Sequence, residues 1–94
     1  MIVRRQTFRA KPGRQTDVVA LLKAQPDNPI GPYRIFISYV GGFGSRVIVD
    51  WEYENEAQHE KLWAEWYARP ETAAFGEKFY ALVDEWQSEL LTVQ

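Results

Sequence analysis

The order in which strand-like and helix-like segments follow one another constrains this chain more than any other feature. Residues 2–10, 33–40 and 45–53 mix β-branched and aromatic residues with polar ones at the two-residue period of strands. Residues 14–25 and a long stretch from 55 onward carry apolar residues at helical spacing, and the final "SELLTVQ" is again strand-like. This order predicts an α+β, ferredoxin-like βαββαβ fold: a four-stranded antiparallel sheet with both helices on one face.

Turn and cap residues separate these segments. "GGFG" predicts a hairpin turn between the second and third strands, with Phe43 at its tip and in contact with a second subunit. Asn55 is expected to cap the second helix, with Gln58 in a capping-box position. The third strand is expected to turn Val47, Val49, Trp51 and Tyr53 to one face.

Pro70 interrupts the second helical stretch. Because proline lacks an amide hydrogen and restricts the preceding residue, we expect the helix to break or kink here and to restart with Pro70 in its first turn. The apolar stripe of this stretch is then expected to continue through Phe75, Phe79, Leu82, Val83 and Trp86. The fourth strand is expected only from Ser88.

Length and composition narrow the possible partners. We expect residues 1–94 to form a single domain, and 15% aromatic residues are more than so short a chain buries alone. A net charge of -2 argues against nucleic acid and anionic membranes as partners. The absence of cysteine excludes disulfides and thiol chemistry, and no apolar segment is long enough to span a membrane. A cytoplasmic location is expected.

The predicted sheet has one face without helices. The second and fourth strands carry apolar residues on both alternating faces, so we expect this open face to be hydrophobic. Monomers rarely expose such a surface. The sequence therefore predicts a two-fold homodimer that buries one sheet against the other.

Two segments resemble a known family. "FRAKPGR" and "GSRVIVDWEYENEAQHEKLW", in which Trp51 and Tyr53 form a W-x-Y pair, resemble NIPSNAP-type proteins of the dimeric α+β barrel superfamily. The resemblance covers nearly the whole chain. It implies a homodimeric α+β barrel.

The spacing of Trp66 and Pro70 also resembles the W-x-x-x-P segment of the antibiotic-biosynthesis and haem-degrading monooxygenases in that superfamily. In the haem-degrading branch an asparagine on strand one, a tryptophan before the helix break and a histidine after it surround the haem. Here these positions fall on Gln6, Trp66 and Gly76, so the iron ligand is missing. We expect no cofactor. Cofactor-free oxidation of electron-rich aromatic compounds by dioxygen remains compatible with the resemblance.

Trp63, Trp66 and Tyr67 are the main candidates for a site. Their spacing places them on one helix face, turned toward the sheet. Core packing is the usual role of such a stripe, since large rings bury much area. The alternative is a cavity walled by these rings and Trp51, with Gln6 or His59 as a polar anchor.

His59, the only histidine, is interpreted as a residue at the edge of the core that hydrogen-bonds a neighbour, with Asp50 as the carboxylate that the fold could bring to it. An acid or base role is the alternative. With one histidine and no cysteine, no metal site is expected.

Strand alternation places Arg4 and Arg5 on opposite faces, so one arginine must face the covered side. If it is buried, it needs a carboxylate partner, for which Asp50 and Glu52 are the candidates.

Two hypotheses about function remain open. The chain either binds or oxidises a small apolar aromatic compound, or it is a non-catalytic, NIPSNAP-like dimeric interaction module.

Overall fold

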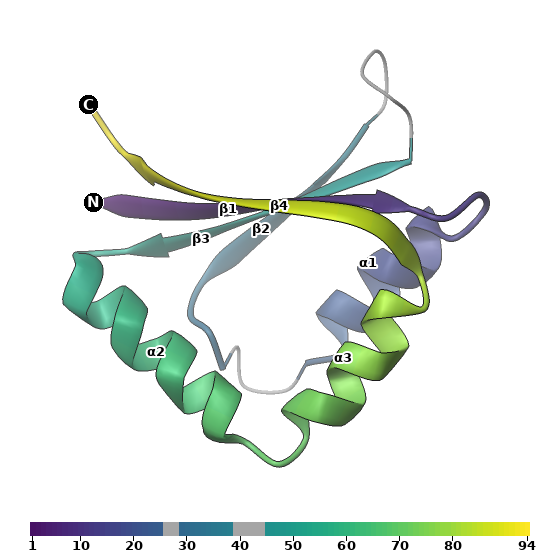
Figure 1. Ribbon diagram of the computed structural model, residues 1–94. Coiled ribbons are helices and arrows are strands. Elements are labelled where there is room, and N and C mark those ends of the chain that lie inside the picture. Colours follow the sequence, from purple (N-terminus) through teal and green to yellow (C-terminus); the bar gives the residue numbers. More distant parts are fainter. Residues whose placement is uncertain (26–28, 39–44) are drawn as a thin grey trace.

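The computed structural model describes residues 1–25, 29–38 and 45–94. Its strands are β1 (Ile2–Ala10), β2 (Tyr33–Ile37), β3 (Arg46–Tyr53) and β4 (Val83–Thr92), and its helices are α1 (Gln15–Lys23), α2 (Glu56–Ala68) and α3 (Thr72–Tyr80). All three helices lie on the same side of the sheet (Figure 1). The helices of the described residues include none that is long and apolar enough to cross a membrane.

The sheet has the strand order β2-β3-β1-β4, and every neighbouring pair is antiparallel. The ferredoxin-like prediction is therefore confirmed. The first helix is shorter at both ends than predicted. Tyr39, Val40, the "GGFG" turn and Phe43 lie outside the described residues.

The register determines which side chains face the helices. Phe8 stands opposite Val47 on one neighbouring strand and opposite Trp86 on the other, so these three side chains share the helix side of the sheet. The predicted inward face of β3 is confirmed, because its alternate residues are buried: Val47, Val49, Trp51 and Tyr53. The core lies between this face and the helices.

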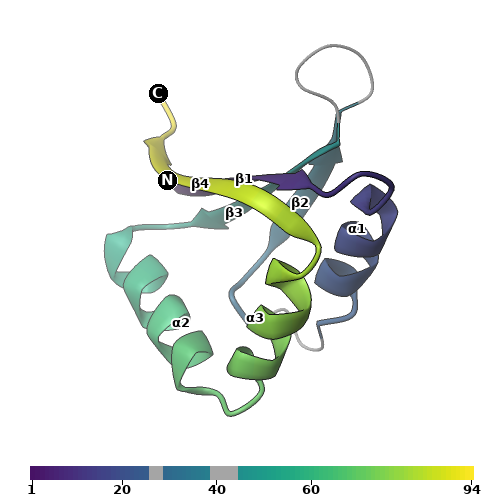
Figure 2. The ribbon, with the colours of Figure 1, turned by 45° about the vertical axis from the view of Figure 1, so that its right-hand side comes forward.

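Pro70 ends α2 as predicted. Arg69 has the extended backbone (φ -74°, ψ 139°) that a residue before proline adopts, and α3 begins only at Thr72. Pro70 therefore precedes the first turn of α3 instead of lying within it, which corrects the predicted restart. The two helices form a V whose open side faces the sheet (Figures 1 and 2).

The start of α2 is capped largely as predicted. The Asn55 side chain accepts a hydrogen bond from the Gln58 amide at 2.9 Å. The Gln58 side chain reaches back to the Glu54 amide (2.7 Å), one residue before the amide that a capping box would use.

The predicted start of the last strand was wrong. Because α3 ends at Tyr80 and β4 begins at Val83, Val83 and Trp86 belong to a strand and not to the helical stripe. Spacings of three and four residues fit a helix, but β1 is long enough to pair along the whole segment, down to Ala10 opposite Val83. Sheet hydrogen bonding thus overrides the local period, with one irregularity in the register next to Ala10.

The open face of the sheet differs from the hydrophobic surface expected. At its centre Arg5 binds Asp50 through two hydrogen bonds of 2.9 and 3.0 Å. Most other residues on this face are charged or polar, and its apolar members are Val3, Phe36, Ile48 and Leu91. The open face of the sheet therefore carries both charged and apolar side chains.

The hydroxyl of Tyr53 connects three parts of the fold. It accepts a hydrogen bond from the Trp63 indole nitrogen at 2.8 Å and donates one to the Ile30 carbonyl at 2.6 Å. It thereby fastens β3 to α2 and to the segment before β2.

We predict that Tyr53→Phe lowers the free energy of unfolding by about 2 kcal/mol, because it leaves a buried indole donor without its acceptor and a carbonyl without its donor. Urea denaturation measures this change. Tyr80→Phe removes the same group from a half-exposed ring and is expected to change stability by less than about 0.5 kcal/mol. Equal effects of the two substitutions would contradict the connecting role.

Candidate functional site

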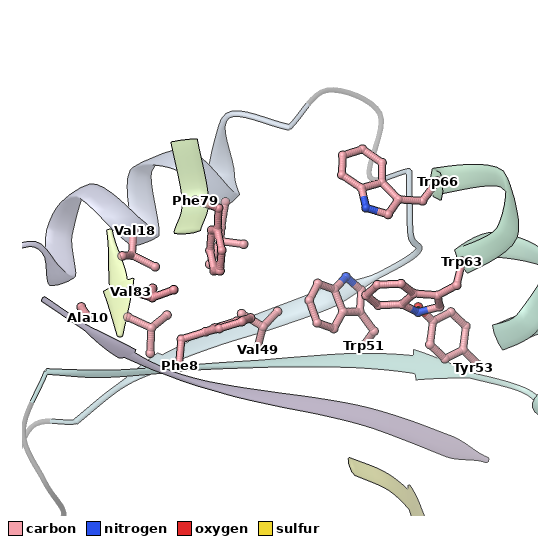
Figure 3. Close-up of a cluster of buried hydrophobic side chains, with 12 residues drawn as sticks. Phe8, Ala10, Val18, Val49, Trp51, Tyr53, Trp63, Trp66, Phe79 and Val83 are labelled. Atoms are coloured by element: carbon pink, nitrogen blue, oxygen red, sulfur yellow. The ribbon is translucent and has the colours of Figure 1, made fainter. Parts of the chain in front are cut away.

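A cavity of about 580 Å³ lies between the sheet and the helices. Its walls come from the helix side of all four strands, from α2 and α3, and from the end of α1 with the segment that follows it. Figure 3 shows the buried side chains in two groups, one around Phe8 and Phe79 and the other around Trp51 and Trp63. The divergence of α2 and α3 at Pro70 separates these groups.

Aromatic rings make up much of the cavity wall. All four tryptophans of the chain contribute: Trp51, Trp63, Trp66 and Trp86. Trp51 and Trp63 meet edge to face, with centroids 5.4 Å apart. The inner rings are buried, whereas Tyr67, Tyr80 and Trp86 are at least half exposed and form a rim. The cavity therefore has an apolar floor and an accessible aromatic edge.

Few polar groups line the cavity. Gln6 donates a hydrogen bond to the Ser88 hydroxyl (3.0 Å), which leaves its carbonyl oxygen as an acceptor. The Thr72 hydroxyl is bound to the Trp66 carbonyl, closing the turn between the helices. Arg4 and Glu77 are the charged residues of the wall.

Arg4 occupies an unusual environment. Its guanidinium carbon lies 3.8 Å from the centroid of Trp63, a cation–π contact, and its Nη1 is 3.2 Å from His59 Nε2. Its Nε is buried and has no hydrogen-bond partner among the described residues. The predicted carboxylate partner was wrong for this face, because Asp50 binds Arg5 on the opposite face and Glu52 points there too.

The side chains in contact with Arg4 are neutral. Burial lowers the pKa of His59, and the positive charge of Arg4 lowers it further. Because arginine only donates, Nε2 of His59 must accept, which places the imidazole proton on Nδ1. Burial raises the pKa of Tyr53 to about 12, against the opposing effect of the Trp63 hydrogen bond. Arg4 is thus the one charged side chain among Arg4, Trp63, His59 and Tyr53, and the more distant charges of Glu60 and Glu56 oppose the lowering of the His59 pKa.

Five of the six candidate residues line the cavity together: Gln6, Trp51, Trp63, Trp66 and Tyr67. His59 does not line the cavity but contacts the wall residue Arg4. Asp50 does not approach His59, because it binds Arg5 on the opposite face of the sheet. Sequence reasoning missed Arg4 and Trp86 as wall residues. Arg4 could have been found, because it lies two residues from Gln6 and therefore on the same face of β1. Trp86 was missed because the last strand was predicted to start only at Ser88.

The residues present do not fit a haem. Gly76, the position that the haem-degrading branch gives to the iron ligand, lies on the cavity wall without a donor, and His59 is occupied by Arg4 outside the wall. The described residues also contain no group of three or more histidine, cysteine or acidic side chains that could hold a metal ion.

We predict that His59 makes stability depend on pH. The unfolded chain protonates this residue near the ordinary pKa of 6.5, whereas in the folded protein the pKa is lower. Between the two values the unfolded state binds more protons, so the free energy of unfolding falls as pH drops below 6.5, by up to about 1.4 kcal/mol per pH unit.

Urea denaturation across this range, together with NMR titration of the single histidine, tests the effect. His59→Gln keeps an acceptor for Arg4 and should remove this part of the pH dependence. A histidine that titrates at or above 6.5 in the folded protein would refute the prediction.

In comparisons with known proteins, no family model and no curated protein matches the sequence. Solved structures do match. A NIPSNAP family protein from Agrobacterium tumefaciens superposes with a TM-score of 0.86 at 17% identity, over 99% of this chain and 92% of that one. An uncharacterized NIPSNAP domain protein from Burkholderia xenovorans gives 0.78 at 20% identity, over 100% and 95%.

A more distant match is an antibiotic biosynthesis monooxygenase, with a TM-score of 0.66 at 14% identity over 100% of this chain and 99% of that one. Identities this low establish a shared fold and leave activity open. The resemblance found in the sequence is therefore confirmed at the level of structure: the chain has the α+β fold of NIPSNAP family proteins and, more distantly, of antibiotic biosynthesis monooxygenases.

Proposed function

We propose that this protein binds a small, flat, apolar aromatic compound in the cavity between its sheet and helices. The observation that supports this proposal is an aromatic-walled space of about 580 Å³, since ligand pockets commonly measure about 300 to 1,000 Å³. If this space held no ligand, the side chains around it would lack the van der Waals contacts that a close-packed core provides.

The shape of the wall favours a flat ligand. Its flat rings pack against one another, with Phe75 stacked on Phe79 and the pairs Trp66–Phe75 and Phe8–Phe79 edge to face, and a flat aromatic ligand can extend such ring contacts. The rim rings Tyr67, Tyr80 and Trp86 belong to the wall and are also exposed, so the cavity wall reaches the protein surface. Only a few polar groups reach the wall, which suits an apolar molecule held by one or two hydrogen bonds.

We predict that Gly76→Leu blocks ligand binding without unfolding the protein. Gly76 lies on the wall, and a Cβ there meets only the Tyr80 ring, at 3.6 Å or more, so the added side chain is tolerated. Leucine also favours a helix over glycine by up to about 1 kcal/mol. Because the new side chain takes up cavity space, we expect affinity to fall about tenfold or more, or about 1.4 kcal/mol.

Tryptophan fluorescence measures this effect directly, since all four tryptophans line the cavity. Naphthols, naphthoquinones and polyphenols are suitable probes. Ala74→Leu is the matched control, because Ala74 is exposed on the same helix and outside the wall. Absence of saturable quenching by every probe would exclude the proposed pocket.

The fold shared with an antibiotic biosynthesis monooxygenase supports cofactor-free oxidation as a second candidate function. The closer match to NIPSNAP family proteins supports a non-catalytic dimeric module as the alternative. Oxygen uptake that is lost in Gly76→Leu supports oxidation, binding of a probe without uptake supports a binding protein, and the absence of both supports the non-catalytic module.

We also propose that the protein is a homodimer that pairs through the open face of the sheet. Phe36 is 45% exposed on this face and stands opposite Ile48, while Val3 and Leu91 form a second apolar pair beyond the Arg5–Asp50 ion pair. Apolar residues on both sides of a central ion pair suit a self-complementary two-fold contact.

Phe36→Glu is expected to convert this dimer to a monomer at micromolar concentration, because it places a charge in the apolar part of the contact. Sedimentation equilibrium measures the change. Tyr67→Glu, on the other side of the molecule, serves as the control and should leave the mass unchanged. A wild-type protein that sediments as a monomer would overturn the proposal.

A further inference from the structure

We propose that the compound bound in this cavity carries a carboxylate, which binds the guanidinium of Arg4 at Nη2. This inference rests on the proposed function, because it names the chemical class of the ligand for the same cavity. It concerns an arginine that no group of the described chain neutralises.

Arg5 and Arg4, adjacent on β1, provide a comparison within one strand. Arg5 uses Nε and Nη2 to hold the two carboxylate oxygens of Asp50, at 2.9 and 3.0 Å. The same edge of Arg4 has no hydrogen-bond partner among the described residues, and only its Nη1 is engaged, by His59. Arg4 therefore has no carboxylate partner of the kind that its neighbour has, and because its Nε is buried, Nη2 is the donor left for a ligand.

The surroundings hold this guanidinium in place but leave its charge uncompensated. Trp63 stacks against one face at 3.8 Å and His59 fixes one end, so the planar group is oriented before any ligand arrives. No described carboxylate lies within 4 Å of Arg4, because the ion pairs of the described chain involve other arginines: Arg5, Arg9, Arg14, Arg34 and Arg69. A guanidinium charge held beside apolar rings without a counter-ion is costly, and an anionic ligand would relieve that cost.

The cavity wall changes from charged to apolar along β1. Arg4, Gln6 and Phe8 follow one another on the helix side of the strand, so charge, amide and ring line the cavity in sequence. At about 3.3 Å per residue, Arg4 and Phe8 are roughly 13 Å apart. This length suits an aromatic acid of two or three fused rings, with its acid group at Arg4 and its rings toward Phe79.

Among the described residues of the wall, Glu77 is the one acidic side chain, and it is exposed on α3. Because it forms no ion pair with Arg4, it does not take the place of the proposed carboxylate. It instead disfavours an anion at the α3 end. The ligand orientation with its acid at Arg4 follows from both charges.

The test compares 2-naphthoate with 2-naphthamide, a neutral molecule of nearly the same shape, by calorimetry on the wild-type protein. We expect the acid to bind at least about tenfold more tightly, because a hydrogen bond between two charged groups is stronger than one to a neutral amide. Arg4→Met, which keeps an unbranched apolar stem, should abolish this preference, so that the acid and the amide bind with affinities within about twofold of each other. Arg34→Met removes the same charge from the opposite face and should keep the preference.

The outcomes separate the two proposals. If neither probe binds the wild-type protein, the proposed pocket fails and the inference fails with it. If the amide binds as tightly as the acid, the pocket stands and the carboxylate is refuted; a preference that survives in Arg4→Met also refutes it. Should Arg4→Met not fold, Arg4→Gln, whose amide can still donate to His59, gives the same comparison.

Discussion

The helix break at Pro70 is the constraint on which the rest of this structure depends. Since proline supplies no amide hydrogen and holds Arg69 in an extended conformation, α2 cannot continue, and α3 returns toward the sheet at an angle. The resulting V leaves a space under the sheet that the side chains only partly fill. One continuous helix would pack along the sheet and close that space.

The two sides of the cavity have different chemistry. Toward α3 the contacts are between hydrocarbon groups, and the ring centroids of Phe8 and Phe79 are 4.6 Å apart. Toward α2 the rings are joined by polar groups: Tyr53 binds Trp63, and Arg4 lies between Trp63 and His59. The first side supplies burial that stabilises the fold, and the second supplies orientation and charge. A ligand that spans both sides can use both kinds of interaction.

The open face of the sheet shows how the same alternation that builds the core also limits association. Every second residue of each strand faces away from the helices, and on β1 and β3 these residues include the Arg5–Asp50 pair. The apolar residues Phe36, Ile48, Val3 and Leu91 are grouped at the two sides of this pair. Such a surface favours association with a surface of complementary charge over non-specific association with any hydrophobic surface.

The sequence by itself determined the order of the elements, the inward face of β3, the cap at Asn55 and the break at Pro70, because each depends on local periodicity or on the backbone chemistry of one residue. It also indicated five residues that line the cavity. Only the tertiary structure decided where β4 begins, because pairing with β1 outweighs the helical spacing of Val83 and Trp86. It alone placed Arg4 against Trp63 and His59, since the partner of a buried charge comes from segments far apart in the chain.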